Sequence, residues 1–247
     1  MSEVNGPGPR YERSGSGEPV LLVGRSLWQP HQVPALVRAG YEAITLDGPE
    51  RADEIASLVG ELGTGPCRLV GFSAGARLVQ EVLARHPEVC TQAVLLATRG
   101  RPDPVGDAML AAERAFRASG VELPPEYQAF LQAALHLAPG TRQQPELVLD
   151  WLDLFEAAAR SGSAPLAPDP GTGFGDQLAA LAGVSVPVLV VGFQHDTVVR
   201  PQLGREVAAA LPRGRYAEIE GCGHYGALEQ PAALNGALLE FFGEPQR

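Results

Sequence analysis

The sequence contains no lysine, because all 19 of its basic residues are arginine. Schiff-base chemistry needs a lysine amine, and the Walker-type phosphate loop needs a lysine beside the phosphates, so both classes of enzyme are excluded. Acidic residues number 29, which gives a formal net charge of -10. A general nucleic-acid binder needs a concentrated positive field, so this charge balance also argues against nucleic acid as a partner.

Cysteines and long apolar runs are also scarce. The three cysteines, Cys67, Cys90 and Cys222, are an odd number at wide spacing. That pattern fits neither a disulfide framework nor a paired-cysteine metal site. We therefore expect no cysteine metal site, and a reducing cytoplasm is the predicted compartment. No other metal and no cofactor is expected. No stretch approaches about 18 consecutive apolar residues, so we expect no membrane span.

The first 17 residues are rich in glycine, proline, serine and charge. They lack the apolar run of a signal peptide, and we predict a poorly ordered tail over residues 1–17.

Short apolar runs alternate with helical patterns over residues 18–98. The runs at 19–23 and 93–97 are continuously apolar, which is typical of buried strands, whereas 51–62 and 74–85 have helical spacing. This alternation predicts an α/β fold with a parallel sheet covered by helices on both faces. Further strands are predicted at 43–46, 68–71, 187–191 and 215–219, and further helices at 33–39, 202–210 and 231–242.

The rhythm changes between residues 99 and 175. No convincing strand pattern occurs there, and three helical patterns cover roughly 105–118, 125–137 and 145–159. The α/β pattern then resumes. The sequence therefore predicts one α/β core, formed by residues 18–98 and 176–247, with a helical block at 99–175 inserted into it.

A Gly-x-Ser-x-Gly motif at residues 71–75 separates a predicted strand from a predicted helix. This context is what a nucleophile elbow requires, since the tight turn leaves room only for Gly71 and Gly75 beside the serine. The N-terminus of the following helix favours developing negative charge. Ser73 is therefore the candidate nucleophile, with a plain glycine-rich turn as the alternative.

Two further segments make the sequence resemble the α/β-hydrolase family. Residues 187–201 (PVLVVGFQHDTVVRP) resemble the strand and loop that carry the catalytic acid, which places the acid at Asp196. Residues 219–231 (IEGCGHYGALEQP) resemble the catalytic-histidine loop, which places the histidine at His224. The chain order Ser73, Asp196, His224 is that of the family. The resemblance implies a mostly parallel sheet flanked by helices, with the inserted block as a helical cap.

The oxyanion hole is where the sequence departs from the family. The backbone N–H of Ala74 is one expected donor. By position, the N–H of Arg25 is the expected second donor, with that of its neighbour Ser26 as the alternative. Val23 stands where the family usually has a histidine. The Arg25 side chain could contact an anionic substrate group or be solvated, and the sequence leaves both possibilities open.

The predicted cap and oxyanion loop also suggest a substrate pocket. Most apolar residues of the cap are expected in its own core, and a few should form an apolar or aromatic acyl pocket. His136 could line this pocket, and Cys222 is expected to pack the histidine loop. The predicted substrate-contacting residues are Leu27, Trp28, Phe130, Trp151 and Phe155.

A Ser-His-Asp set implies acyl transfer through an acyl-enzyme. The leading expectation is hydrolysis of an ester or thioester with a small or medium apolar or aromatic acyl group. One alternative is an acyltransferase that moves an acyl group from a carrier-protein thioester to a thiol, amine or hydroxyl. A non-catalytic binding protein on the same fold is another. The expected partner is a small acyl ester or thioester, joined by an acyl-carrier protein if the transferase alternative holds.

Overall fold

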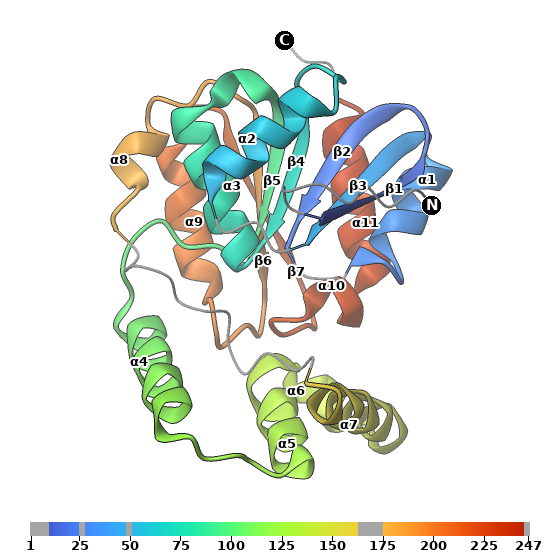
Figure 1. The fold of residues 1–247 in the computed structure, drawn as a ribbon, viewed down its shortest axis with the longest axis vertical. Helices are drawn as coiled ribbons and strands as arrows, with labels where there is room; N and C mark the ends of the chain where they lie inside the picture. The colour runs from blue at the N-terminus through green and yellow to red at the C-terminus, as the bar shows by residue number, and fades with distance from the viewer. Residues whose placement is uncertain (1–9, 25–27, 48–50, 163–174, 245–247) are drawn as a thin grey trace.

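A seven-stranded sheet forms the centre of the computed structural model, which describes residues 10–24, 28–47, 51–162 and 175–244. The strand order is β1-β3-β2-β4-β5-β6-β7 (Figure 1). β1 is antiparallel to β3, and the other neighbouring strands are parallel. The strands are β1 (Arg10–Gly15), β2 (Glu18–Val23), β3 (Tyr41–Asp47), β4 (Cys67–Phe72), β5 (Cys90–Leu96), β6 (Val188–Phe193) and β7 (Gly214–Ile219).

Helices cover both faces of the sheet, as the continuously apolar strands predict. Every residue of β4 and of β6 is buried. Alternate strand residues face two separate apolar clusters, one under α2, α3 and α9 and the other under α1 and α11. These helices are α1 (Gln32–Arg38), α2 (Ala52–Glu61), α3 (Ala74–Arg85), α9 (Pro201–Ala210) and α11 (Pro231–Phe242).

The edge strand β1 corrects the prediction of a tail over residues 1–17. Residues 10–15 pair with β3 along their whole length, and the Arg13 guanidinium forms a salt bridge with Glu42 at 2.8 Å. An edge strand can be this polar because backbone pairing and a cross-strand ion pair hold it without a fully buried face. Residues 1–9 lie outside the described residues.

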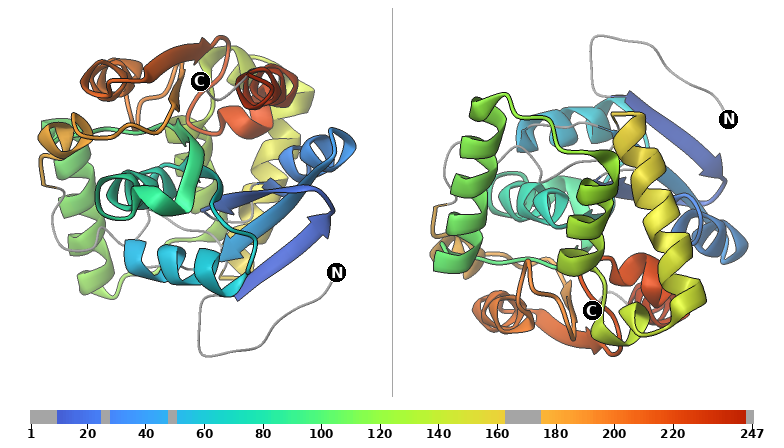
Figure 2. Two further views of the ribbon diagram at one scale, coloured as in Figure 1. Left: turned by 90° about the horizontal axis from the view of Figure 1, so that it is seen from above. Right: turned by 90° about the horizontal axis from the view of Figure 1, so that it is seen from below.

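Helices α4 to α7 follow β5, and the described residues between β5 and β6 contain no strand. These helices lie together on one side of the core (Figures 1 and 2). A small apolar cluster of Ala129, Ala133, Leu137 and Phe155 joins α5 to α7. The boundaries of a separate cap, 99–175, stay a prediction. The remaining helices are α4 (Pro104–Ser119), α5 (Pro125–His136), α6 (Pro139–Arg142), α7 (Pro145–Arg160), α8 (Leu178–Leu181) and α10 (Gly226–Glu229), with a short 3₁₀ turn at Pro87–Val89.

Candidate active site

The turn between β4 and α3 holds Ser73 in an unusual backbone conformation. Its φ of 53° and ψ of -112° lie where side chains are seldom found, which costs about 1–3 kcal/mol. The Ser73 N–H donates to the Leu96 carbonyl at 2.9 Å and so ties the turn to β5. A Cβ at Gly71 would lie 2.6 Å from Ala76 Cα, and one at Gly75 would lie 2.2 Å from the Val23 oxygen. Both glycines are therefore required, as the motif predicts.

Asp196 lies in the loop after β6 and is 4% exposed. Its Oδ1 accepts hydrogen bonds from the backbone N–H groups of Val198 and Val199, both at 2.8 Å. Its Oδ2 lies 2.8 Å from His224 Nδ1. A buried carboxylate needs such partners to offset its lost hydration. The contact with Nδ1 fixes the imidazole so that Nε2 is left to accept a proton.

His224 lies in the loop between β7 and α10 and is 5% exposed. Its ring centroid is 4.9 Å from that of Phe72, the residue directly before Ser73. The parallel strands β4, β6 and β7 all end at this edge of the sheet. The structure thus brings the candidate histidine to the candidate acid and places it beside the elbow that carries Ser73.

Ala74, one of the two predicted oxyanion donors, lies directly after Ser73 in the described part of the chain. Ala74 is exposed and is the first residue of α3, where a backbone N–H has no acceptor within the helix. The close approach of Gly75 to Val23 places the end of β2 against the elbow. Arg25 and Leu27 lie outside the described residues, so their roles stay predictions.

Trp28 corrects the predicted substrate pocket. Its side chain is fully buried and packs edge-on against Phe72, with ring centroids 6.3 Å apart. The apolar ring therefore belongs to the core beneath the elbow. Phe130 lies on α5 with 58% of its surface exposed, and Phe155 is buried against Tyr225 with ring centroids 5.9 Å apart. Substrate contact by Phe130 and Phe155 stays a prediction.

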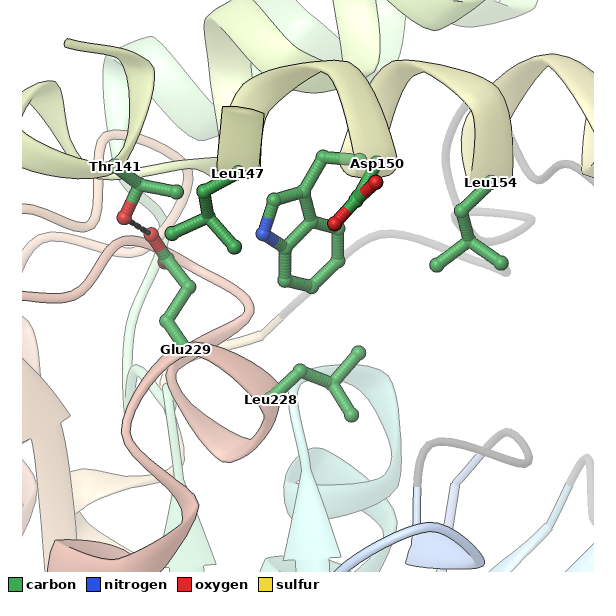
Figure 3. A pocket seen from close by; sticks show the side chains of 7 residues that line it. Thr141, Leu147, Asp150, Leu154, Leu228 and Glu229 are labelled. Atoms are coloured by element: carbon green, nitrogen blue, oxygen red, sulfur yellow. Dashed lines mark hydrogen bonds between the residues drawn. The ribbon is translucent and has the colours of Figure 1, made fainter. Parts of the chain in front are cut away.

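Trp151 lines a cavity of about 230 Å³ between α7 and α10 (Figure 3). Its ring is stacked on Tyr225 at 6.5 Å and 11°. Tyr225 directly follows His224 in the chain, but neither residue is among those that line the cavity. Its described lining is mostly apolar and carries two carboxylates but no basic side chain. The lining residues are Thr141, Leu147, Asp150, Trp151, Leu154, Leu228 and Glu229.

His136 lies closer to the site than its lack of a motif suggests. Its ring stacks on Tyr225 at 4.7 Å and 15°, and its centroid is 5.5 Å from that of His224. Its Nδ1 lies 3.1 Å from the Gln132 carbonyl oxygen. Burial, together with the neighbouring His224, lowers the pKa of His136 to about 4. His136 is therefore neutral at neutral pH.

Cys222 is buried and its thiol donates to the Ile219 carbonyl at 3.3 Å. Burial raises the pKa of this thiol to about 12, so the reactive thiolate is not formed at neutral pH. The residue packs the histidine loop, as predicted.

The described residues hold no group of three or more His, Cys, Asp or Glu side chains placed to share a metal ion. No helix in the described ranges combines the length and apolar character of a membrane-spanning segment.

The fold and the site geometry together define a class of protein. Residues 14–237 match the alpha/beta hydrolase family, and the chain belongs to that family. It is 38% identical to the Mycobacterium tuberculosis protein named "Putative non-heme bromoperoxidase BpoC", over 94% of this chain and 96% of that protein. The crystal structure of that protein superposes with a TM-score of 0.86 at 37% identity and covers 95% of each chain.

A further relative is the "Putative carbamate hydrolase RutD" of Pseudomonas savastanoi. It is 27% identical over 77% of this chain and 73% of its own length. The protein is thus an α/β-hydrolase enzyme with hydrolase-type activity.

We predict that His136 makes the folded protein less stable in acid. Its pKa is about 4 when folded and near 6.5 when unfolded, so the unfolded chain binds the proton first. The free energy of unfolding is therefore higher above pH 6.5 by on the order of 3 kcal/mol, and this difference is lost as the pH falls towards 4. Urea unfolding of the wild type and of His136→Phe between pH 7 and 4 checks this. The wild type should lose more stability than the variant, and parallel curves would contradict the assignment.

Proposed function

We propose that the protein hydrolyses esters or thioesters by acyl transfer through Ser73, His224 and Asp196. The observation that carries the proposal is the buried hydrogen bond between Asp196 and His224 at 2.8 Å, beside a serine held on a strained turn. An unassisted serine hydroxyl is a weak nucleophile at neutral pH. A histidine of fixed orientation supplies the base that it needs.

In the proposed reaction, His224 Nε2 takes the proton of Ser73 Oγ as the oxygen attacks the acyl carbon. Asp196 stabilises the imidazolium that results. The negative charge on the tetrahedral intermediate is stabilised by hydrogen bonds from the backbone N–H of Ala74 at the start of α3 and from the predicted donor Arg25. His224 then protonates the leaving alcohol or thiol. Water, deprotonated by His224, releases the acid and restores Ser73.

A neutral, apolar or aromatic acyl group is the proposed substrate, because the cavity between α7 and α10 has a mostly apolar lining. Trp151 and the leucines of α7 and α10 offer apolar walls, and Asp150 contributes a carboxylate. An acyl chain that ends in a carboxylate would meet like charge at Asp150, which opposes binding.

A small-molecule substrate is also favoured over an acidic carrier protein. Such a carrier would dock on arginines near the inserted helices, and several of these already face carboxylates. The salt bridges are Arg99 to Asp107, Arg101 to Glu206, Arg117 to Glu113 and Arg160 to Glu126.

A second candidate function, bromide oxidation, is favoured by the name of the 38% identical relative. The same acyl-enzyme would serve if hydrogen peroxide replaced water. The peroxide oxygen would attack the acyl carbon, Ser73 would leave with a proton, and a peracid would form. The peracid would then oxidise bromide to hypobromous acid and be reduced to the carboxylic acid.

We expect Ser73→Ala to abolish turnover of a short-chain aryl ester, because no other group in the proposed mechanism can form the acyl-enzyme. The fall should be roughly 10³-fold or more in kcat. Hydrolysis is followed by release of the phenol, and circular dichroism shows whether the variant is folded. Labelling with a fluorophosphonate should mark the wild type alone. Full activity in a folded Ser73→Ala sample would refute the proposal.

Water and peroxide can be compared as acyl acceptors on the same protein. If the protein is a hydrolase, the carboxylic acid should stay the main product when hydrogen peroxide is added. The wild type should then brominate a phenolic indicator no faster than Ser73→Ala does. Bromination that requires Ser73, an acyl donor and peroxide together would instead assign the second function.

A further inference from the structure

Glu229, at the end of α10, uses both carboxylate oxygens as hydrogen-bond acceptors. Its Oε2 accepts from the backbone N–H of Gly223 at 2.6 Å. Its Oε1 accepts from the Ala138 N–H at 2.9 Å and from Thr141 Oγ1 at 2.5 Å; Figure 3 shows the contact with Thr141. Gly223 directly precedes His224, whereas Ala138 and Thr141 belong to the link between α5 and α6 and to α6 itself. One side chain therefore joins the histidine loop to the inserted helices.

The histidine loop and the α5–α6 link are also in direct backbone contact. A Cβ at Gly223 would lie 2.4 Å from the His136 oxygen and 2.9 Å from the Ala138 nitrogen. On the other side of His224, the Tyr225 N–H donates to the His136 carbonyl at 3.3 Å. The backbone is thus held immediately before and immediately after His224.

The acid loop is fixed to the same part of the inserted helices. Thr197, the residue after Asp196, donates from its hydroxyl to the Leu135 carbonyl at 2.8 Å. Residues 135–141 therefore contact both loops that carry the candidate acid and base. Any displacement of residues 135–141 would therefore be transmitted to the Asp196–His224 pair.

A carboxylate suits this position for a chemical reason. Its three partners are two N–H groups and a hydroxyl that donates, so the side chain must offer acceptors only. A carboxylate does so and makes shorter, stronger hydrogen bonds than a neutral group. A glutamine of the same shape would turn an N–H₂ group towards at least one of these donors.

We propose that Glu229 is a positioning residue for His224. It acts through Gly223, by clamping the histidine loop to the α5–α6 link. The inference rests on the proposed function, because it assigns Glu229 to the geometry of the Ser73–His224–Asp196 set. It also makes the α5–α6 link part of the framework that holds the histidine loop in place.

The test compares Glu229→Gln with Glu240→Gln, an exposed glutamate of α11. For an aryl ester, kcat of Glu229→Gln should fall roughly 10- to 100-fold, the usual consequence of a slightly misplaced catalytic group. KM should stay within about twofold, and fluorophosphonate labelling should slow in proportion to kcat. Glu240→Gln should match the wild type in all three. Unfolding midpoints check that the variants are folded at the assay temperature.

A wild-type kcat in folded Glu229→Gln would overturn the inference, and so would a rise in KM alone, which would make Glu229 merely a wall of the cavity. If Glu229→Gln does not fold, Thr141→Val takes its place, because it removes one donor and keeps the carboxylate. Its kcat should fall about threefold or more, and a wild-type kcat would overturn the inference. Absence of fluorophosphonate labelling in the wild type would instead reject the proposed function itself.

Discussion

The structure of the site depends on the buried carboxylate of Asp196. An unpaired charge at 4% exposure would cost several kcal/mol. The protein offsets this cost with two backbone N–H groups from the loop after β6 and with the His224 imidazole. The two backbone N–H groups can reach the carboxylate only if the loop turns back on itself directly after Asp196. The His224 imidazole can reach the carboxylate only if the histidine loop lies against the acid loop. The Asp196 charge therefore fixes both loops.

The sheet supplies the frame that makes this arrangement possible. Its parallel strands end at one edge, and apolar clusters pack against both faces of β4 and β6. Residues that are far apart in the chain therefore meet at this edge with little freedom. The end of α5 and the α5–α6 link pack against the same two loops. The end of α5 contacts the acid loop at Thr197 and the histidine loop at Tyr225, and the link contacts the histidine loop at Gly223.

The sequence predicts those features that depend on local pattern. The elbow follows from two glycines and an abrupt change from strand to helix periodicity, and the Asp196 and His224 loops follow from family resemblance. Features that depend on distant partners are missed. β1 is polar and is recognisable only from its pairing with β3, and Trp28 is buried by Phe72. The role of Glu229 depends on Ala138, which lies 91 residues away.

If the acyl group is carried by Ser73, mass spectrometry of a rapidly quenched reaction should detect it there. The wild-type protein is mixed with an aryl ester, quenched in acid within the first turnover and digested. The peptide that contains Ser73 should carry an added acyl mass, formed as fast as the phenol is released. An acyl group carried by a different residue would contradict the role proposed for Ser73.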